Sequence, residues 1–447
     1  MNRIASSLFF LFALTVAYPS VGQGQPKHLG AKTCAHCHGT ADWTRMTHYT
    51  IWSATDLHSR AFQVLSNDLS KEIAGWMALP EGQPESWDKC TRCHTPGVAA
   101  KNRGPHYALS DGVDCEACHG PAENWFLPHL EFDATHERNV QYGMIDLKDL
   151  ETRARMCLKC HSGLDHEIVA SGHPDLSFEL FHFSFWQPPH WDYQEAPPFV
   201  FWAVGQTIAL EEALGNLNQA LTDPTTGKSL HVEVFDNKNC YQCHHKLSYD
   251  RWRFVEAHYS AVQPLFKNLV SDRSEAIDRE MDEMNSLIDS PDPSSQFELL
   301  KKAHETQQEI SALLPRIKES VTSRAGDEAL IQTLMSDLTL PVPEPANEID
   351  YPEMDIPHAW VVREYEKAEQ KYLALKTLGI ALEAKDRQMT TGELLKAMEG
   401  GELGSESLQS IDDLWQFVDS IYPAGRRKFK PSEFNEVLAR VREAVKE

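Results

Sequence analysis

The stretch Cys115-Glu116-Ala117-Cys118-His119 carries the pattern that decides how this chain must fold. Two cysteines stand three positions apart, and a histidine follows the second one directly. The pattern occurs five times and uses all ten cysteines of the chain. Its other copies begin at Cys34, Cys90, Cys157 and Cys240. Chance would place one such pentapeptide in about one chain per hundred, so five copies require a shared chemical reason.

That reason is the covalent attachment of haem. Two thiols at this spacing lie on one side of a helical turn and can form thioether bonds to both vinyl groups of one haem. The histidine that follows then supplies the proximal nitrogen ligand of the iron. The sequence therefore predicts five covalently bound haem c groups. The predicted attachment residues are Cys34, Cys37, Cys90, Cys93, Cys115, Cys118, Cys157, Cys160, Cys240 and Cys243. The predicted proximal ligands are His38, His94, His119, His161 and His244.

Other interpretations of paired cysteines explain these residues less well. A zinc site can use Cys-x-x-Cys pairs, but it does not need a histidine directly after the second cysteine in every copy. Thioredoxin-like redox motifs would not occur five times in one chain. Disulfides are the default for ten cysteines in an exported protein. They would leave the five histidines unexplained, and a bridge within one Cys-x-x-Cys would be strained.

The second axial position of each iron decides between an electron carrier and an enzyme. A histidine or methionine there closes the iron, whereas an open position can bind a substrate. Of the 21 histidines, 18 precede residue 256, so distal ligands are plentiful. The predicted distal ligands are His58, His129, His166, His173 and His245, with His48 as a weaker candidate. Ordinary surface or core roles are expected for His106, His136, His182, His190 and His231. One open iron stays an alternative.

Several of these segments resemble the cytochrome c-554 family of multihaem electron carriers from nitrifying bacteria. The similarity rests on Lys32–His38, on His58–Phe62 with Trp52 before it, and on Cys90–Gly97. It is most specific at Gly112–Pro121, which His129 follows. In that family the counterparts of His58 and His129 are distal haem ligands, and one of four haems is five-coordinate.

A second resemblance concerns the fourth motif. The segment from Cys160 to His166, ending at His173, is similar to hydroxylamine oxidoreductase-type multihaem proteins, in which two distal histidines occur here. Together the resemblances cover about residues 30 to 180. The chain departs from the family core by its fifth motif, by the lack of a histidine shortly before the fourth motif, and by a long C-terminal region. These departures leave the electron path and the ligand of the fourth haem undecided.

The chain ends give the expected location and domain organisation. Residues 1–22 combine Arg3 with the apolar run Leu8–Ala17 and small residues, which predicts a secretory signal peptide. Residues 23–255 are expected to form a pentahaem cytochrome c domain, in which the motifs at Cys90 and Cys115 would be neighbours. Residues 256–447 are expected to be an α-helical C-terminal domain, because apolar residues recur there at helical spacing.

No transmembrane segment is expected in the mature chain. A formal net charge of −24 argues against nucleic acid as a partner.

The sequence therefore predicts a mainly α protein with little regular structure around the haems. We expect a periplasmic or otherwise exported pentahaem c-type cytochrome that transfers electrons between redox partners, in the periplasm or in a respiratory complex. The alternative is a multihaem oxidoreductase. One open haem would then act on hydroxylamine, nitric oxide or nitrite. No catalytic acid or base can be assigned for that alternative, because nothing in the sequence places a side chain over a particular iron.

Overall fold

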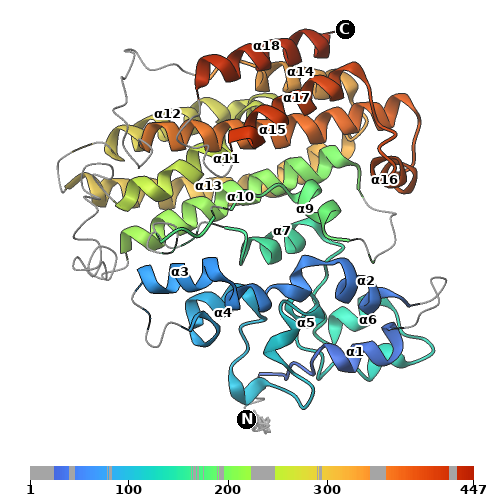
Figure 1. Ribbon diagram of the computed structural model, residues 1–447. Helices are drawn as coiled ribbons and strands as arrows, with labels where there is room; N and C mark the ends of the chain where they lie inside the picture. The colour runs from blue at the N-terminus through green and yellow to red at the C-terminus, as the bar shows by residue number, and fades with distance from the viewer. Residues whose placement is uncertain are drawn as a thin grey trace, which may run out of the picture.

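The computed structural model describes residues 25–39, 46–77, 79, 83–162, 164, 168, 171–174, 176–188, 190, 196–222, 247–288, 290, 294–342, 359–421 and 430–446. The predicted signal peptide, residues 1–22, lies outside this set. Figure 1 shows short helices around the first four motifs in the lower half of the view and long helices above them. The predicted mainly α fold is confirmed.

The lower half consists of short helices joined by turns. Its α-helices are five to nine residues long: α1 (Ala31–His38), α2 (His48–Thr55), α3 (Asp68–Trp76), α4 (Asp88–His94), α5 (Cys115–His119), α6 (His136–Gln141), α7 (Leu150–Leu158) and α9 (Leu180–Trp186). Between them lie 3-10 turns: η1 (Leu57–Arg60), η2 (Gln63–Ser66), η4 (Pro84–Ser86), η5 (Ala100–Asn102), η6 (Leu109–Asp111) and η7 (Pro128–Leu130). Helices this short are not stable alone in water, so their stability must come from what they pack against.

Local capping explains where the motif helices begin and end. The Asp114 carboxylate accepts hydrogen bonds from the backbone N–H of Glu116 and of Ala117, at 3.1 and 3.2 Å, and so starts α5. Gly120, at a φ of +79°, ends the same helix in a conformation that favours glycine. The Asp149 side chain starts α7 in the same way, through the N–H of Thr152 at 2.9 Å. The third motif is thus held in a short helix that is capped at both ends.

The upper half is a bundle of long helices. Its members are α10 (Pro198–Thr222), α11 (Leu247–Leu269), α12 (Ser271–Ile288), α13 (Ser294–Ser323), α14 (Glu328–Leu338), α15 (Ala359–Asp386), α16 (Thr391–Glu399), α17 (Glu406–Ile421) and α18 (Pro431–Lys446). Helix α10 lies at the centre and packs against α7, α9, α11, α13 and α15. It is buried without a break from Pro198 to Glu211, as expected of a helix that is apolar on all sides.

The helices predicted in the C-terminal region are confirmed. Helix α12 ends at Ile288 and α13 begins at Ser294, on either side of Ser290–Pro293, where two prolines in the sequence predict a break between helices. The predicted capping box of α16 is also present: the Thr390 hydroxyl accepts the Glu393 N–H at 3.3 Å, and the Glu393 carboxylate accepts the Thr390 N–H at 2.8 Å.

One local expectation is wrong. The Pro-rich, aromatic run His182–Trp191 suggests a loop over haem faces, with ordinary core as the alternative, but α9 runs through Trp186. The buried Glu179 carboxylate starts this helix by accepting the backbone N–H of Phe181 and of His182, at 3.0 and 2.8 Å. The helix ends before Pro188, since proline disfavours helical backbone in the residue that precedes it. The first part of this aromatic run is therefore helical, with Phe181, His182 and Ser184 buried.

Ion pairs fasten the fourth-motif helix α7 to the bundle. Arg155 of α7 binds Glu211 of α10 at 2.7 Å. Lys318 of α13 binds Asp149 at 3.0 Å, at the start of α7. The domain boundary predicted at residue 255 falls inside α11, and the division into domains stays a prediction. The fourth motif thus lies where the two halves meet (Figure 1).

Candidate metal centres

The first four Cys-x-x-Cys-His motifs lie on α1, α4, α5 and the end of α7. Their eight cysteines are thiols that form no disulfide. The thiol of Cys34 is hydrogen-bonded to that of Cys115, and the thiol of Cys160 to that of Cys93. Within the described residues, therefore, the first motif contacts the third, and the second contacts the fourth. The sequence had suggested the second and third as neighbours.

Four histidine pairs are the main feature of the lower half. Each pair joins one motif histidine to one histidine from elsewhere in the chain, with ring centroids at nearly the same separation. The four pairs are His38–His129 at 6.4 Å, His94–His173 at 6.3 Å, His119–His190 at 6.4 Å and His58–His161 at 6.1 Å. We call them the first, second, third and fourth pair, in the order given.

This separation fits two axial ligands of one iron. A metal ion holds an imidazole nitrogen at about 2.0–2.1 Å, and the ring centre lies about 1.1 Å beyond that nitrogen. Two imidazoles on opposite sides of one iron therefore have centroids about 6.3 Å apart. All four pairs lie within a few tenths of an ångström of this value. The residues present consequently fit haem iron with two histidine ligands.

Hydrogen bonds orient six of the eight rings through Nδ1. Four of these rings are hydrogen-bonded to backbone carbonyls: His94 to Ala61 at 2.7 Å, His129 to Phe126, His173 to Pro174 at 2.7 Å and His190 to Pro188 at 3.4 Å. The other two are bonded to side chains: His38 to Nδ1 of His48 at 2.8 Å and His58 to Oδ1 of Asp56 at 2.9 Å. Histidines that bind a metal through Nε2 almost always use the other nitrogen in this way, which fixes the ring and raises its basicity.

The protonation of the buried rings also suits metal binding, which requires neutral imidazole. Burial, with smaller contributions from nearby histidines, lowers the pKa of His119 to about 4. Burial likewise lowers the pKa of His161 to about 4, assisted by His58. Both rings are therefore neutral near pH 7 and can donate a lone pair to iron.

In the fourth pair, a buried carboxylate holds His58 through two hydrogen bonds. Asp56 is 2% exposed, and its carboxylate accepts the backbone N–H of His58 at 2.9 Å as well as the ring Nδ1. Burial alone would raise the pKa of Asp56, but the hydrogen bonds and charge of His58 outweigh that effect and lower it. A charged carboxylate at Nδ1 is the kind of partner that fixes the ring of a metal-binding histidine.

The third pair contains a histidine that the sequence did not single out. His190 was expected to be an ordinary residue, yet its ring lies opposite His119 and also 6.2 Å from His48. It follows two prolines in a segment without helical periodicity, so no local pattern marks it. His48 was a weaker ligand candidate. Its Nδ1 bonds His38, which places it beside the first pair.

Three predicted residues or sites cannot be placed. His166, His245 and the fifth motif, with Cys240, Cys243 and His244, lie outside the described residues. In the described ranges, no group of three or more histidine, cysteine or acidic side chains could hold a metal ion. The ligands that a zinc site would need are therefore not brought together there. No helix in those ranges is long and apolar enough to span a membrane.

Exposed apolar side chains gather around the same motifs. Of twelve large apolar side chains that are exposed among the described residues, ten lie between residues 46 and 186. Leu57, next to His58, is 78% exposed, and Phe132, near His129, is fully exposed. Large exposed apolar groups of this kind mark surfaces that bind something. Haem faces are apolar, so haems bound by the four pairs would cover such groups.

Comparison with known proteins agrees with this geometry. Residues 33–120, which contain the first three motifs, match the family model of cytochrome c554 and c-prime. This part of the chain is therefore similar to c-type multihaem cytochromes of the cytochrome c-554 family. Similarity to this family implies covalently bound haem c.

One curated relative is similar over a longer stretch than the family model. Cytochrome c-554 of Nitrosomonas europaea is 27% identical over 143 residues, which make up 30% of this chain and 56% of the relative. The chain therefore spans about half the length of that relative. No solved structure matches. The cytochrome c-554 similarity leaves the long helical bundle unaccounted for.

Proposed function

We propose that this protein is an exported pentahaem electron carrier in which pairs of histidines close the irons. The observation that carries the proposal is the set of four histidine pairs at 6.1 to 6.4 Å. A haem with two histidine ligands has no position for a substrate and exchanges electrons instead. The proposed ligands are His38 with His129, His94 with His173, His119 with His190, and His161 with His58.

The hydrogen bonds at Nδ1 of the histidines affect the reduction potentials of these haems. An acceptor at Nδ1 raises the basicity of a ligand, and a more basic ligand favours ferric over ferrous iron. Methionine ligation, by contrast, raises the potential. We therefore infer potentials below those of histidine–methionine cytochromes, with the Asp56–His58 contact acting most strongly on the fourth haem.

The contacts between motifs suggest an electron path. Cys34 of the first motif bonds Cys115 of the third. Burial, and then the charge of Cys157 in the fourth motif, raises the pKa of Cys118 in the third, and the thiol of Cys160 in the fourth is hydrogen-bonded to that of Cys93 in the second. We infer that electrons pass through the haems in the order first, third, fourth, second. The fifth haem, on Cys240 and Cys243 with His244, would join this chain, with His166 as a candidate for its second ligand. His245 directly follows His244 and would point about 100° away from it on a helix, so it could bind only the iron of a neighbouring haem.

The net charge of the protein indicates which kind of redox partner it would bind. With a formal net charge of −24, the protein would meet basic redox proteins, whose approach electrostatic attraction speeds. The predicted signal peptide supports encounters in the periplasm or elsewhere outside the cytoplasm. Association with such a partner should weaken as salt screens the opposite charges.

Stopped-flow mixing of the reduced holoprotein tests the proposal. With a basic cytochrome as oxidant we expect rapid reoxidation that slows as ionic strength rises. With hydroxylamine or nitrite we expect no consumption of the nitrogen compound. Mass spectrometry of the same sample should give the mature chain plus five haems. Sustained turnover of hydroxylamine or nitrite would overturn the carrier and favour an oxidoreductase with one open haem.

A further inference from the structure

His48 lies beside the first pair without belonging to any of the four pairs. It is the first residue of α2, and its ring centroid is 4.9 Å from that of His38. This separation is too short for two ligands of one iron, which need about 6.3 Å. The two rings meet instead through a hydrogen bond between their Nδ1 atoms at 2.8 Å. His48 therefore contacts the proximal ligand of the first haem and is not a second ligand of the same iron.

The chemistry of this hydrogen bond fixes which ring donates. If Nε2 of His38 binds iron, Nδ1 of His38 must carry the remaining proton of that ring. Nδ1 of His48 is then the acceptor, and neutral His48 keeps its own proton on Nε2. Burial, and then the charge of His190, lowers the pKa of His48 below its ordinary value. The His48 ring is therefore neutral near pH 7 and can accept the hydrogen bond from His38.

Helix α2 holds His48 in this position. It packs against α1, the helix that carries His38. Trp52 of α2 is 8% exposed, and its indole N–H donates to the carbonyl of Val113 at 3.1 Å, two residues before the third motif begins. The acceptor at His38 thus comes from a helix that is fastened to both the first and the third motif.

His48 also lies 6.2 Å from His190, a separation that would fit an iron between these two rings. Nδ1 of His190 is hydrogen-bonded to the Pro188 carbonyl, so His190 has one nitrogen left and can bind one iron. His119 lies at a similar distance from His190, 6.4 Å, and directly follows the attachment cysteines of the third motif. The third iron therefore belongs between His119 and His190, and His48 serves the first haem.

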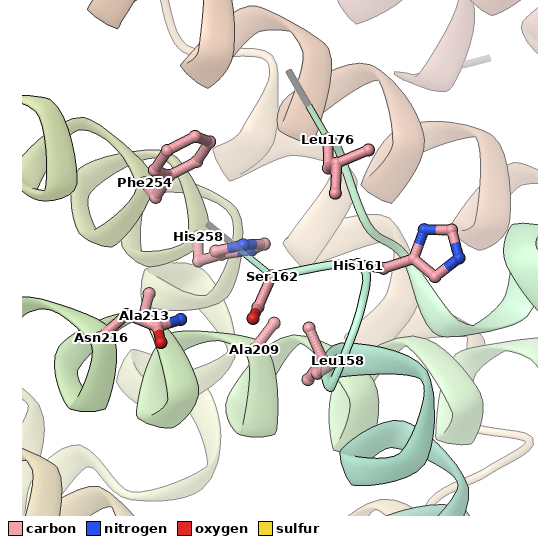
Figure 2. Close-up of a pocket in the computed structure, with 9 residues that line it drawn as sticks. All are labelled: Leu158, His161, Ser162, Leu176, Ala209, Ala213, Asn216, Phe254 and His258. Carbon is pink, nitrogen blue, oxygen red and sulfur yellow. The ribbon is translucent and has the colours of Figure 1, made fainter. Parts of the chain in front are cut away.

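We propose that His48 is a positioning residue for the first haem, which orients the His38 ring and makes this ligand more basic. An imidazole nitrogen is a stronger base than the backbone carbonyl that accepts from His94. A more basic ligand favours ferric iron, so His48 lowers the potential of the first haem. By contrast, Nδ1 of His161 has no hydrogen-bond partner among the described residues, and Figure 2 shows its ring turned away from the pocket between the fourth motif and the bundle.

The same hydrogen bond helps to set the ring geometry of the first pair. Its rings are inclined by 13°, whereas those of the other three pairs are inclined by 70° to 89°. His129 is held by the Phe126 carbonyl and His38 by His48, so each ring of the first pair has its own support. Near-parallel imidazoles give a rhombic low-spin EPR signal, which lets the first haem be followed separately from the other three.

Two substitutions of nearly equal size separate the acceptor from the packing of the ring. In His48→Asn the amide oxygen takes the place of Nδ1 along the side chain and can still accept, whereas His48→Leu puts a methyl group there. We expect the midpoint potential of the rhombic signal to rise slightly in H48N and further in H48L. The signal of H48L should also broaden, because the His38 ring loses its fixed orientation. His136→Leu is the matched control, since His136 also begins a short helix, α6, and its ring bonds Asp146.

Redox titration of the holoproteins followed by EPR gives these potentials, and His129→Ala, which opens the first iron, identifies the rhombic signal. Equal shifts in H48N and H48L, no shift in either, or a shift to lower potential would overturn the proposal. A high-spin signal in H48L would overturn it as well, because His48 would then be an iron ligand.

The inference rests on the proposed ligation of the first iron by His38 and His129. If that ligation fails, H129A leaves every low-spin signal of the wild-type protein in place. This result would refute the ligation itself, and it is distinct from an H129A that loses the rhombic signal while H48L keeps the wild-type potential.

Discussion

Replacing Asp114 by asparagine should stabilise the protein at high pH and leave it unchanged at low pH. Asp114 is 3% exposed. Burial, and then the charge of Glu116, raises its pKa from 3.8 to about 7. Between those values the folded state keeps a proton that the unfolded chain releases, so stability falls as pH rises. At 1.36 kcal/mol per pH unit the difference amounts to about 4 kcal/mol. Asparagine removes this cost and still caps α5 through its side-chain oxygen.

Guanidinium unfolding curves of both proteins between pH 4 and 8.5 provide the assay. We expect the gain of D114N to be absent near pH 4, to grow through pH 7 and to level off above it. Asp149→Asn is the matched control, because Asp149 caps α7. Burial would raise the pKa of Asp149, but hydrogen bonds from Thr152 and Lys318 lower it instead. D149N should therefore lose stability at neutral pH, and the loss should shrink in acid. A D114N protein no more stable than wild type at pH 8.5 would refute the reasoning.

Three further substitutions probe the ligands and the core. His58→Ala should open the fourth iron and create a high-spin ferric EPR signal from one haem, whereas His136→Ala, at a surface ion pair with Asp146, should not. Asp56→Asn should weaken the hydrogen bond at His58 Nδ1 and raise the potential of the same haem, which redox titration would detect. Trp202→Ala, at a fully buried site on α10, should lower the free energy of unfolding by about 3–5 kcal/mol with the haem spectra unchanged. An unaltered denaturation midpoint would contradict that last expectation.

The attachment residues could be predicted because their chemistry is local. Two thiols and a histidine within one helical turn define a site whatever the rest of the chain does. The distal candidates depended more on context. His58, His129 and His173 follow recognisable segments, and the structure brings each of them opposite a motif histidine. His190 follows two prolines without any periodic pattern, so only the tertiary fold places it beside His119.

Long-range contacts also limit what the sequence can predict about the helical bundle. Apolar spacing predicted where most C-terminal helices lie, because one face of each must be buried. It could not predict that the apolar α10 packs against α13 and α15, since a helix apolar on all sides specifies no neighbour. His258 illustrates the same limit. It lies 97 residues after His161 in the sequence, yet both line one pocket.

Low-temperature EPR of the oxidised protein tests the histidine ligation most directly. Near-parallel imidazoles split the iron d orbitals and give a rhombic low-spin signal, whereas perpendicular rings give a signal of larger anisotropy. The first pair is inclined by 13°, and the others by 70° to 89°. In a variant with Cys240 and Cys243 replaced by alanine, which removes the fifth haem, we predict one rhombic and three highly anisotropic signals, all unchanged by cyanide. A high-spin ferric signal in that variant would contradict the account, because at least one of the four irons would then be open.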